Sequence, residues 1–378
     1  MSQRQDQKVQ DRRLEGSGRL RARVIGVVSP NWVHTAMGVK FNERYFMDPE
    51  YRQVENRQVA DWIGTFNTML QTRFARYDVD WEPVGISGIA GMYDPDGLEK
   101  LTVGLPQPFP VVTAMFGGEI VYFDNDNPDS KGEPLAGISS ASEVHIPDFA
   151  TTFPVSVYLQ QYEDLVARFG KDKVDLSFLY LHSPLTIAYR LRGEQLFFDM
   201  VDDPELATAI LEVAHATSLG VYEMYERIGD RPERLLPIAT CIASLISPDV
   251  YRKWEIPWLR RQIERHPKAL VHSCGPSSHI LDLLAELPGI DFMEVGAGTD
   301  IARTRVLFPK ATINYVVDTP KFRNHTPVQV DAEICQVIRD NEGGPLTIIW
   351  PAETGTPIET IEAIYAAVSD YNQHGSEA

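Results

Sequence analysis

The second half of the chain alternates short apolar runs with longer amphipathic stretches, and this alternation constrains the fold more than any other feature. The helical stretches include residues 204–228 and 248–265. Around them, apolar runs that predict strands occupy residues 176–181, 235–238, 269–272, 290–295, 311–316 and 346–350. Strands that alternate with helices of this length predict a parallel sheet with helices on its outside. Because many β-α units follow one another and no G-x-G-x-x-G turn occurs, the pattern favours a single (β/α)8 TIM-type barrel over an open dinucleotide-binding sheet.

The first part of the chain predicts a tail and a helical extension in front of the barrel. Residues 1–20 are polar and lack the apolar stretch of a signal peptide, so we expect a flexible tail. A short apolar run at 24–28 precedes an aromatic and polar segment, and residues 58–76 have the apolar spacing of a long amphipathic helix. From residue 79 to about 146, short β-prone runs such as VDWEPVGI, FPVVTAMF and EIVYF follow, broken by the turn-rich NDNPDSKGEP.

The charge balance argues against partners that are themselves acidic. The 378 residues contain 35 Lys and Arg against 53 Asp and Glu, which gives a formal net charge of −18. Such a chain repels phosphate backbones and anionic lipid, so neither nucleic acid nor a membrane is expected as a partner. No apolar run approaches the roughly 20 residues of a membrane-spanning helix. The 3 cysteines are far apart in the sequence, which suits reduced thiols in the cytoplasm better than a disulfide framework.

The sharpest candidate site is the H-x-C motif in ALVHSCG. In a TIM-type barrel the active site is built by the loops at the carboxyl ends of the strands. His272 and Cys274 lie two positions apart at such an end, so both side chains can point to the same side. An imidazole and a thiolate in this arrangement can hold one metal ion, with zinc as the first candidate. A buried histidine near a structural cysteine is the alternative, and the motif alone leaves both interpretations open.

A zinc ion needs at least a third protein ligand. Two residues that follow predicted strands are the main candidates: Glu353 in TIIWPAETGTP is the first choice, and Cys241, after the strand at 235–238, is the second. Glu294 ends another strand, whereas Cys335 lies in a predicted helix, where packing is the simpler role. Each of these residues, taken alone, is also explained by a structural role.

Three further polar residues stand near strand ends, where they can reach the mouth of a barrel. Tyr180 and His182 end the run LSFLYLH, and Asn314 lies in INYVVD. We expect these three side chains to serve the reaction, by hydrogen bonding in the case of Asn314. No G-x-S-x-G elbow and no G-x-x-x-x-G-K-[ST] loop occurs, which leaves serine hydrolases and ATPases without support.

Around HSCG and at several other places the sequence resembles the uroporphyrinogen decarboxylase superfamily, and in particular its cobamide-dependent methyltransferase branch. The matching segments are RYFMDPEYR, HSPLTIAYRLRGEQLFFDMVDDPE, SLISPDVYRKWEIPWLRRQIE, LVHSCGPSSHILDLLAELPGIDFMEV and TGTPIETIEAI. They occur in the family's order and cover nearly everything after the polar tail. The resemblance implies one α/β barrel over residues 21–378, of which 21–78 form an N-terminal helical elaboration.

The resemblance also implies a ligand set. In the methyltransferase branch the H-x-C motif, here His272 and Cys274, supplies two zinc ligands, and a cysteine after the final strand supplies the third. This sequence departs from that pattern, because WPAETGTP contains no cysteine and the carboxylate of Glu353 falls near the missing thiolate. Fewer thiolates leave a more electrophilic zinc, which is better suited to polarising a substrate oxygen.

The expected function is therefore a zinc-dependent transfer of a methyl group between a small molecule and a corrinoid. The small molecule is a methyl donor, with a methyl ether preferred, or a thiol acceptor. No D-x-H-x-x-G motif of a corrinoid domain occurs, so the corrinoid must be carried by a partner protein.

Two alternative functions remain. One is a metal-free decarboxylase of the uroporphyrinogen type, for which the N-terminal segment offers only Arg44. The other is an inactive corrinoid-partner protein that has lost a ligand.

Overall fold

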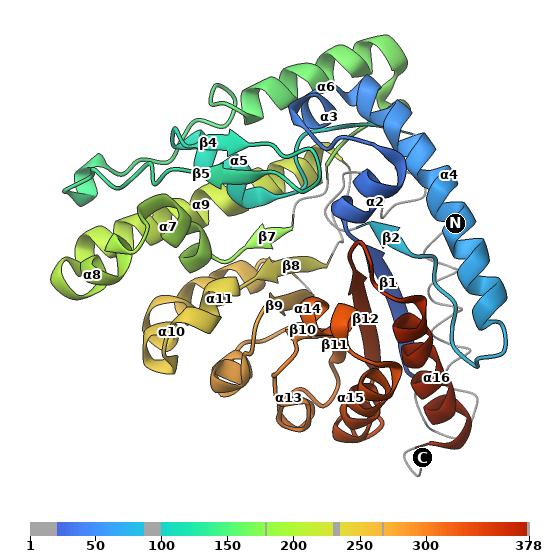
Figure 1. Ribbon diagram of the computed structural model, residues 1–378. Coiled ribbons are helices and arrows are strands. Elements are labelled where there is room, and N and C mark those ends of the chain that lie inside the picture. The colour runs from blue at the N-terminus through green and yellow to red at the C-terminus, as the bar shows by residue number, and fades with distance from the viewer. Residues whose placement is uncertain (1–20, 87–99, 178–179, 230–234, 267, 376–378) are drawn as a thin grey trace.

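An eight-stranded parallel sheet curls around the centre of the molecule (Figure 1). The computed structural model describes residues 21–86, 100–177, 180–229, 235–266 and 268–375. The strand order is β2, β1, β12, β11, β10, β9, β8 and β7, with the bounds Gly85–Ile86, Arg23–Val28, Leu346–Ala352, Thr312–Val316, Ile290–Gly296, Ala269–Ser273, Leu236–Ala239 and Leu181–His182. The expected α/β fold of the TIM-barrel type is thereby confirmed, whereas the expected tail at 1–20 lies outside the described residues.

The strands nearest the two ends of the chain lie side by side and bring its N-terminal part into the barrel. β1 and β12 pair in parallel along the whole length of β1. No side chain fits at Gly26, because a Cβ built there lies 2.1 Å from the ring of Trp350. Trp350 is fully buried, so the close approach of strand and ring depends on this glycine. The segment 21–78, expected as an N-terminal elaboration, therefore contributes one strand, β1, to the barrel sheet.

Helices surround the sheet, and many begin with a proline just after a capping side chain. The α-helices are α2 Pro30–Met37, α3 Glu43–Met47, α4 Pro49–Phe74, α5 Pro108–Met115, α6 Val155–Phe169, α7 Pro184–Arg192, α8 Gln195–Asp202, α9 Pro204–Ile228, α10 Pro248–Trp254, α11 Ile256–Ile263, α12 Leu281–Leu284, α13 Ile301–Leu307, α14 Thr319–Asn324, α15 Pro327–Asp340 and α16 Ile358–His374. Single turns of 3-10 helix are η2 Ala141–Glu143, η3 Lys171–Lys173, η4 Cys241–Leu245 and η5 Ser278–Ile280. None of the described helices combines the length and the apolar character needed to cross a membrane.

Several expectations about single elements need correction. The run FPVVTAMF, expected as β-prone, lies mostly in α5, because prolines are tolerated in the first turn of a helix. The strand expected at 176–181 is divided into β6, Val174–Leu176, and β7. The helix expected at 248–265 is divided into α10 and α11, because Pro257 cannot continue the helical hydrogen bonds.

Two small sheets lie outside the eight-stranded sheet. β3, Leu101–Val103, pairs in parallel with β6, and β4, Glu119–Val121, pairs antiparallel with β5, Asp129–Lys131. A separate group of buried apolar side chains packs α7, α8 and α9 against one another. α7, α8 and the first half of α9 therefore form a group of their own beside the barrel strands (Figure 1).

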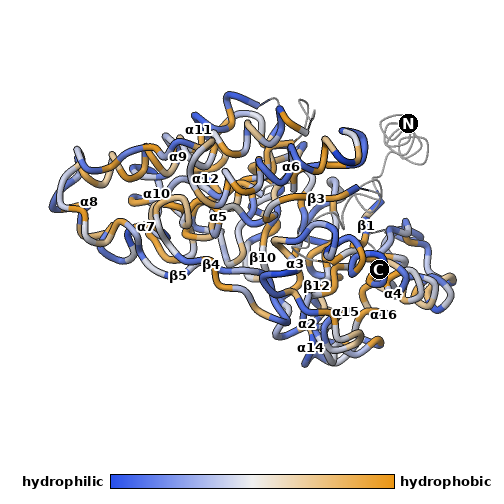
Figure 2. Tube along the Cα trace, turned by 90° about the horizontal axis from the view of Figure 1, so that it is seen from above, coloured by the Kyte–Doolittle hydropathy of each residue, from blue (hydrophilic) through white to orange (hydrophobic). Residues whose placement is uncertain are grey.

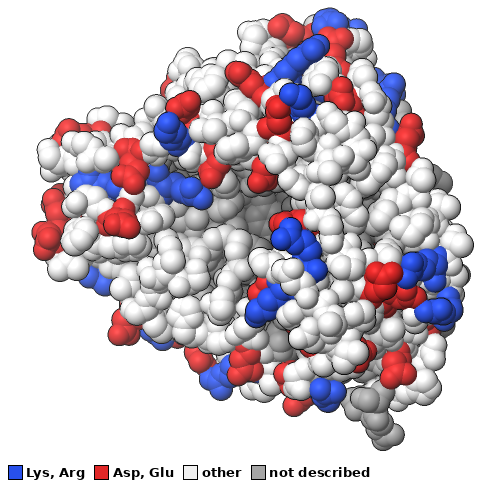
Figure 3. Space-filling view, viewed as in Figure 1, with Lys and Arg blue, Asp and Glu red and all other residues white. Residues whose placement is uncertain are grey.

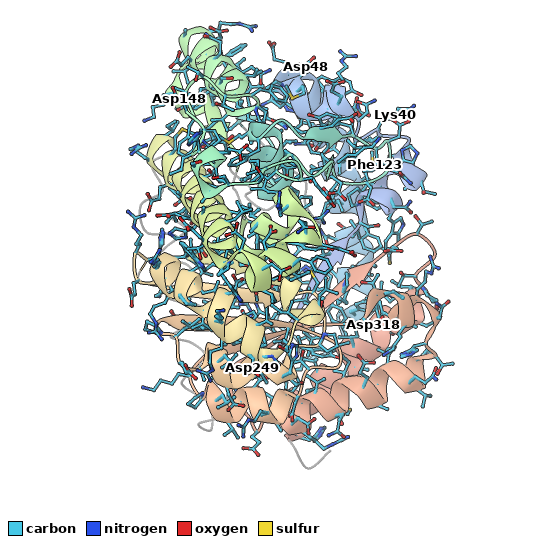
Figure 4. All side chains as sticks on the ribbon, turned by 90° about the vertical axis from the view of Figure 1, so that its left-hand side faces the viewer. Lys40, Asp48, Phe123, Asp148, Asp249 and Asp318 are labelled. Carbon is cyan, nitrogen blue, oxygen red and sulfur yellow. The ribbon has the colours of Figure 1, made fainter. Side chains whose placement is uncertain are left out.

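The loops that follow the strands gather on one face of the molecule. α2 and α14, which follow β1 and β11, both lie on the side of the molecule that faces the viewer in Figure 1 (Figure 2). In a side view, Lys40, Phe123 and Asp318 stand along the same edge, and Asp318 directly precedes α14 (Figure 4). Figure 3 looks onto this face and shows a hollow near its centre, with acidic and basic side chains around it. This is the face at which a barrel of this type builds its site.

Candidate metal centre

Three neighbouring strands bring the H-x-C motif beside a second cysteine. His272 in β9 pairs in register with Ala239 in β8 and with Glu294 in β10. Paired positions of parallel strands stand beside each other on the same side of the sheet, and so do positions two residues further along. Cys274 and Cys241 each lie two residues beyond a paired position. The strand register thus explains why their two sulfur atoms meet.

The three side chains form a compact cluster. The Sγ atoms of Cys241 and Cys274 are 3.0 Å apart, and His272 Nε2 lies 2.9 Å from Cys274 Sγ. One ligand atom from each of the three residues lies within 4.8 Å of the other two, a spacing that could hold a metal ion. Of the two candidates for the third ligand, the structure brings Cys241, and not Glu353, to the H-x-C motif.

Glu294 contacts the other nitrogen of the imidazole. His272 Nδ1 and Glu294 Oε1 are 2.7 Å apart. A carboxylate in this position accepts a hydrogen bond from the Nδ1–H, fixes the tautomer and the ring orientation, and leaves Nε2 to face the two sulfur atoms. The sequence identified Glu294 as a residue at a strand end, but its pairing with His272 follows from the register of β9 and β10.

The groups of the cluster shift one another's pKa values. The hydrogen bond with Cys274 lowers the pKa of Cys241 far below its usual range, and His182 and His272 add to this effect. The same interaction raises the pKa of Cys274, because two adjacent thiolates repel each other. Burial lowers the pKa of His272, but hydrogen bonds with Cys241 and Glu294 outweigh burial and raise it to about 10. The site therefore favours a thiolate at Cys241, the form in which cysteine binds metals.

Two of the expected catalytic residues stand beside the cluster. The rings of Tyr180 and His272 are in edge-to-face contact, with centroids 6.0 Å apart. The Tyr180 hydroxyl is buried and has no hydrogen-bond partner among the described residues. Burial raises the pKa of Tyr180 well above its usual value, so the phenol stays protonated. His182, which hydrogen-bonds Cys241, packs its ring edge-on against Phe109 with centroids 5.2 Å apart.

The remaining candidates lie in the same barrel at different places. Asn314 in β11 is opposite Glu294 in the register, so it belongs to the same row of the sheet. Glu353 directly follows β12, its side chain is 50% exposed, and its carboxylate lies 4.0 Å from Arg323 Nη1. Cys335 lies in α15, as expected, where it packs half-buried against the core.

The donor set of the cluster fits zinc. Two cysteine sulfurs and one imidazole nitrogen are ligands that zinc takes in proteins, and three protein ligands leave a position for water or substrate, as in catalytic zinc sites. Cys241, His272 and Cys274 would hold the ion. Glu294 would orient the imidazole from outside the ligand set, in the way that carboxylates commonly support zinc-bound histidines.

Comparison with known proteins identifies the family. A sequence model of the family described as uroporphyrinogen decarboxylase (URO-D) matches residues 103–371, which is more than half of the chain. No curated protein sequence matches the chain. Among solved structures, a methyltransferase from Methanosarcina mazei shares the fold with a TM-score of 0.58 over 94% of this chain and 95% of that one, at 16% sequence identity. The resemblance to this superfamily is confirmed, and the chain belongs to the uroporphyrinogen decarboxylase family.

Proposed function

We propose that this protein is a zinc-dependent methyltransferase that moves a methyl group between a small molecule and a corrinoid carried by a partner protein. The cluster of Cys241, His272 and Cys274 at the carboxyl ends of β8 and β9 is the observation that carries the proposal. The fold likeness to a methyltransferase supports it. The inactive alternative depended on a lost ligand, and Cys241 offers a replacement for that ligand.

Tyr180 favours a methyl ether as the small molecule. A protonated phenol beside the cluster can donate a hydrogen bond to an oxygen that gains negative charge. Such an oxygen appears when the C–O bond of an ether breaks, since the methyl group leaves for the corrinoid and the electron pair stays on oxygen. A thiol acceptor would instead be presented as a thiolate, which needs no donor at that point.

Each residue of the site would have a separate role in the reaction. Cys241, His272 and Cys274 hold the metal, and Glu294 keeps the imidazole in place. When bound, zinc supplies a Lewis acid that stabilises charge on the leaving atom. Tyr180 donates its hydroxyl proton as a hydrogen bond to that atom.

The decarboxylase alternative finds less support in the N-terminal segment. A tetrapyrrole with several carboxylates needs a group of cations that are free to bind it. Arg44 is the arginine of that segment, and it is exposed, lies 3.7 Å from the carboxylate of Asp48 and stacks over the ring of Tyr51. Its contacts hold it at the outer surface of α3 and α4.

Metal content per chain tests the zinc site. Protein purified without chelators is expected to carry near-stoichiometric zinc in the wild type and in Cys335→Ser, a matched loss of a thiol on α15. His272→Ala and Cys274→Ala are expected to lose the metal, because each removes one ligand of three. Wild-type protein that stays metal-free after preparation with excess zinc would refute the proposal.

Methyl transfer tests the reaction. We expect zinc-loaded wild-type protein to demethylate an aromatic or alkyl methyl ether in the presence of cobalt(I) cobalamin, followed by the absorbance of methylcobalamin. The reverse arm offers methylcobalamin and a small thiol. Turnover in the thiol arm alone would keep the methyltransferase and overturn the ether assignment, and turnover in neither arm, with corrinoid protein supplied, would overturn the reaction.

A further inference from the structure

A fully buried carboxylate lies behind the candidate metal centre. Glu255, between α10 and α11, is 0% exposed. Its Oε2 accepts a hydrogen bond of 3.0 Å from the backbone N–H of Leu185, and its Oε1 accepts one of 3.3 Å from the Thr240 hydroxyl. The Ser183 side chain also hydrogen-bonds the carboxylate. Glu255 therefore receives hydrogen bonds from the loops that follow β7 and β8.

These hydrogen bonds reach the residues next to the site. Ser183 directly follows His182, and Thr240 directly precedes Cys241. The backbone N–H of Thr240 also donates to the carbonyl of His272 at 2.8 Å. One carboxylate thus joins the ends of two strands, at Thr240 next to Cys241 of the cluster and at Ser183 next to His182, which hydrogen-bonds Cys241.

With Glu255 ionised, the network around Thr240 has one consistent set of donors. The Thr240 hydroxyl has a single proton and donates it to Glu255, so the Tyr251 hydroxyl, 3.0 Å away, donates to Thr240. Thr240 and Tyr251 are both fully buried, as is Ser183. The Thr240 and Tyr251 hydroxyls depend on an acceptor at Glu255, so its loss would leave a buried donor unpaired.

A carboxylate in this place is costly for the fold. Burial raises the pKa of Glu255 to about 7, although its hydrogen bonds oppose that shift. An apolar side chain of similar size would pack α10 and α11 without this cost. The hydrogen bonds to the loops after β7 and β8 are what the carboxylate adds to packing.

We infer that Glu255 is a positioning residue for the metal centre. It ties Thr240 at the end of β8 to the end of β7, and because the Thr240 backbone N–H binds the His272 carbonyl, this fixes the place of Cys241 relative to His272. The inference rests on the proposed function, because the centre it positions is the proposed zinc site. Glu255 touches no ligand atom and acts through Thr240 and Ser183.

The test compares Glu255→Gln with a matched buried carboxylate. Glutamine keeps one acceptor oxygen and turns an amide N–H toward a present donor. Either the Leu185 N–H loses its acceptor, or the Thr240 hydroxyl must turn to accept from the amide, which leaves the Tyr251 hydroxyl proton without its acceptor. Asp199→Asn is the control, since Asp199 is also buried and pairs with Arg192 at the far end of α7. The readouts are the zinc dissociation constant, measured by competition with a chelator, and the visible spectrum of the cobalt(II)-substituted protein, which reports the ligand geometry.

We expect Glu255→Gln to bind zinc at least about fivefold more weakly and to change the cobalt(II) spectrum, since outer partners of metal sites commonly contribute about 10- to 100-fold in affinity. Thr240→Val, which removes one link of the network and keeps the carboxylate, should shift both readouts in the same direction. It decides the matter if Glu255→Gln does not fold. Asp199→Asn should keep the wild-type spectrum and affinity even if its stability falls.

Three outcomes would overturn the inference in distinguishable ways. A folded Glu255→Gln variant with wild-type affinity and spectrum would show that the carboxylate does not position the centre. An equal loss in Asp199→Asn would show that general destabilisation explains the effect. Wild-type protein that binds neither zinc nor cobalt(II) would refute the proposed function, and the inference with it.

Discussion

The ends of β8 and β12 both carry residues that can bind a metal, yet the two ends are held differently. After β8, Thr240 is buried and bound to Glu255, and Cys241 follows it into the cluster. After β12, Glu353 is half exposed, and its carboxylate meets Arg323 at 4.0 Å near the surface. One strand end is therefore held by the protein interior and the other is open to solvent.

This difference shows that a position after a barrel strand is not sufficient to make a residue a metal ligand. The barrel places the residue after each strand on the correct face, whatever its identity. Whether that residue reaches the centre depends on the direction in which the loop turns and on the buried contacts that hold the turn. A ligand site needs both conditions, because a ligand that is free to move must be ordered at an entropic cost when the metal binds.

The largest expected effect comes from removing the sulfur at the buried end. Cys241→Ser should weaken zinc binding by about 1000-fold, which is roughly 4 kcal/mol, because a lost ligand exceeds the 10- to 100-fold contribution of outer partners. Zinc competition with a chelator measures the effect. The matched control is Cys335→Ser, which removes a thiol from α15. If Cys241→Ser bound zinc with wild-type affinity, the third ligand would lie elsewhere, and the end of β8 would not supply a ligand that the end of β12 lacks.

The next largest effect is a pH dependence that belongs to the buried end alone. The pKa of Glu255 is raised by burial to about 7, against an ordinary value of 4.5. The folded state then binds a proton more tightly than the unfolded state, so this group favours folding below pH 4.5 and loses that contribution as the pH rises to about 7. The difference between the two pKa values, 4.5 unfolded and about 7 folded, corresponds to about 3 kcal/mol of folding free energy.

Glu255→Gln isolates this contribution, because glutamine does not titrate. The free energy of unfolding of the wild type, minus that of the variant, should fall as the pH is raised from about 4.5 to about 7 and then stay level. Denaturant unfolding at a series of pH values measures both curves. If the unfolding free energies of wild type and variant changed with pH in parallel, Glu255 would not titrate in this range. The buried end of β8 would then not differ from the exposed end of β12 in this respect.

Much of the fold could be predicted from the sequence, because it follows from local patterns. The barrel strands of the second half carry apolar runs whose residues are buried or half-buried, and α9 keeps the predicted bounds 204–228. The errors arose where a pattern admits two structures. FPVVTAMF is apolar apart from Thr113 and carries no period that separates a helix from a strand. Only Pro110, with Pro108 just before the run, points to the first turn of α5.

The candidate site could be predicted in part, for a different physical reason. The H-x-C spacing is local, so His272 and Cys274 could be paired from the sequence. The partnership of Cys241 with Cys274, and of Glu294 with His272, depends on strand register, which joins residues 33 and 22 positions apart. The network of Glu255 is equally non-local. Glu353 was placed by alignment across a shortened loop, and sequence does not reveal which way a shortened loop turns.

The smallest expected effect is at the exposed end. Glu353→Gln removes a charge from a long ion pair between two side chains that are about half exposed, Glu353 and Arg323. Such pairs contribute at most about 0.5 kcal/mol, because water and salt screen them. We therefore expect the zinc dissociation constant to stay within about twofold of the wild-type value and the stability to change by less than about 0.5 kcal/mol. A tenfold loss of zinc affinity in Glu353→Gln would mean that the loop after β12 closes over the bound metal, so that both strand ends, and not β8 alone, contribute to the centre.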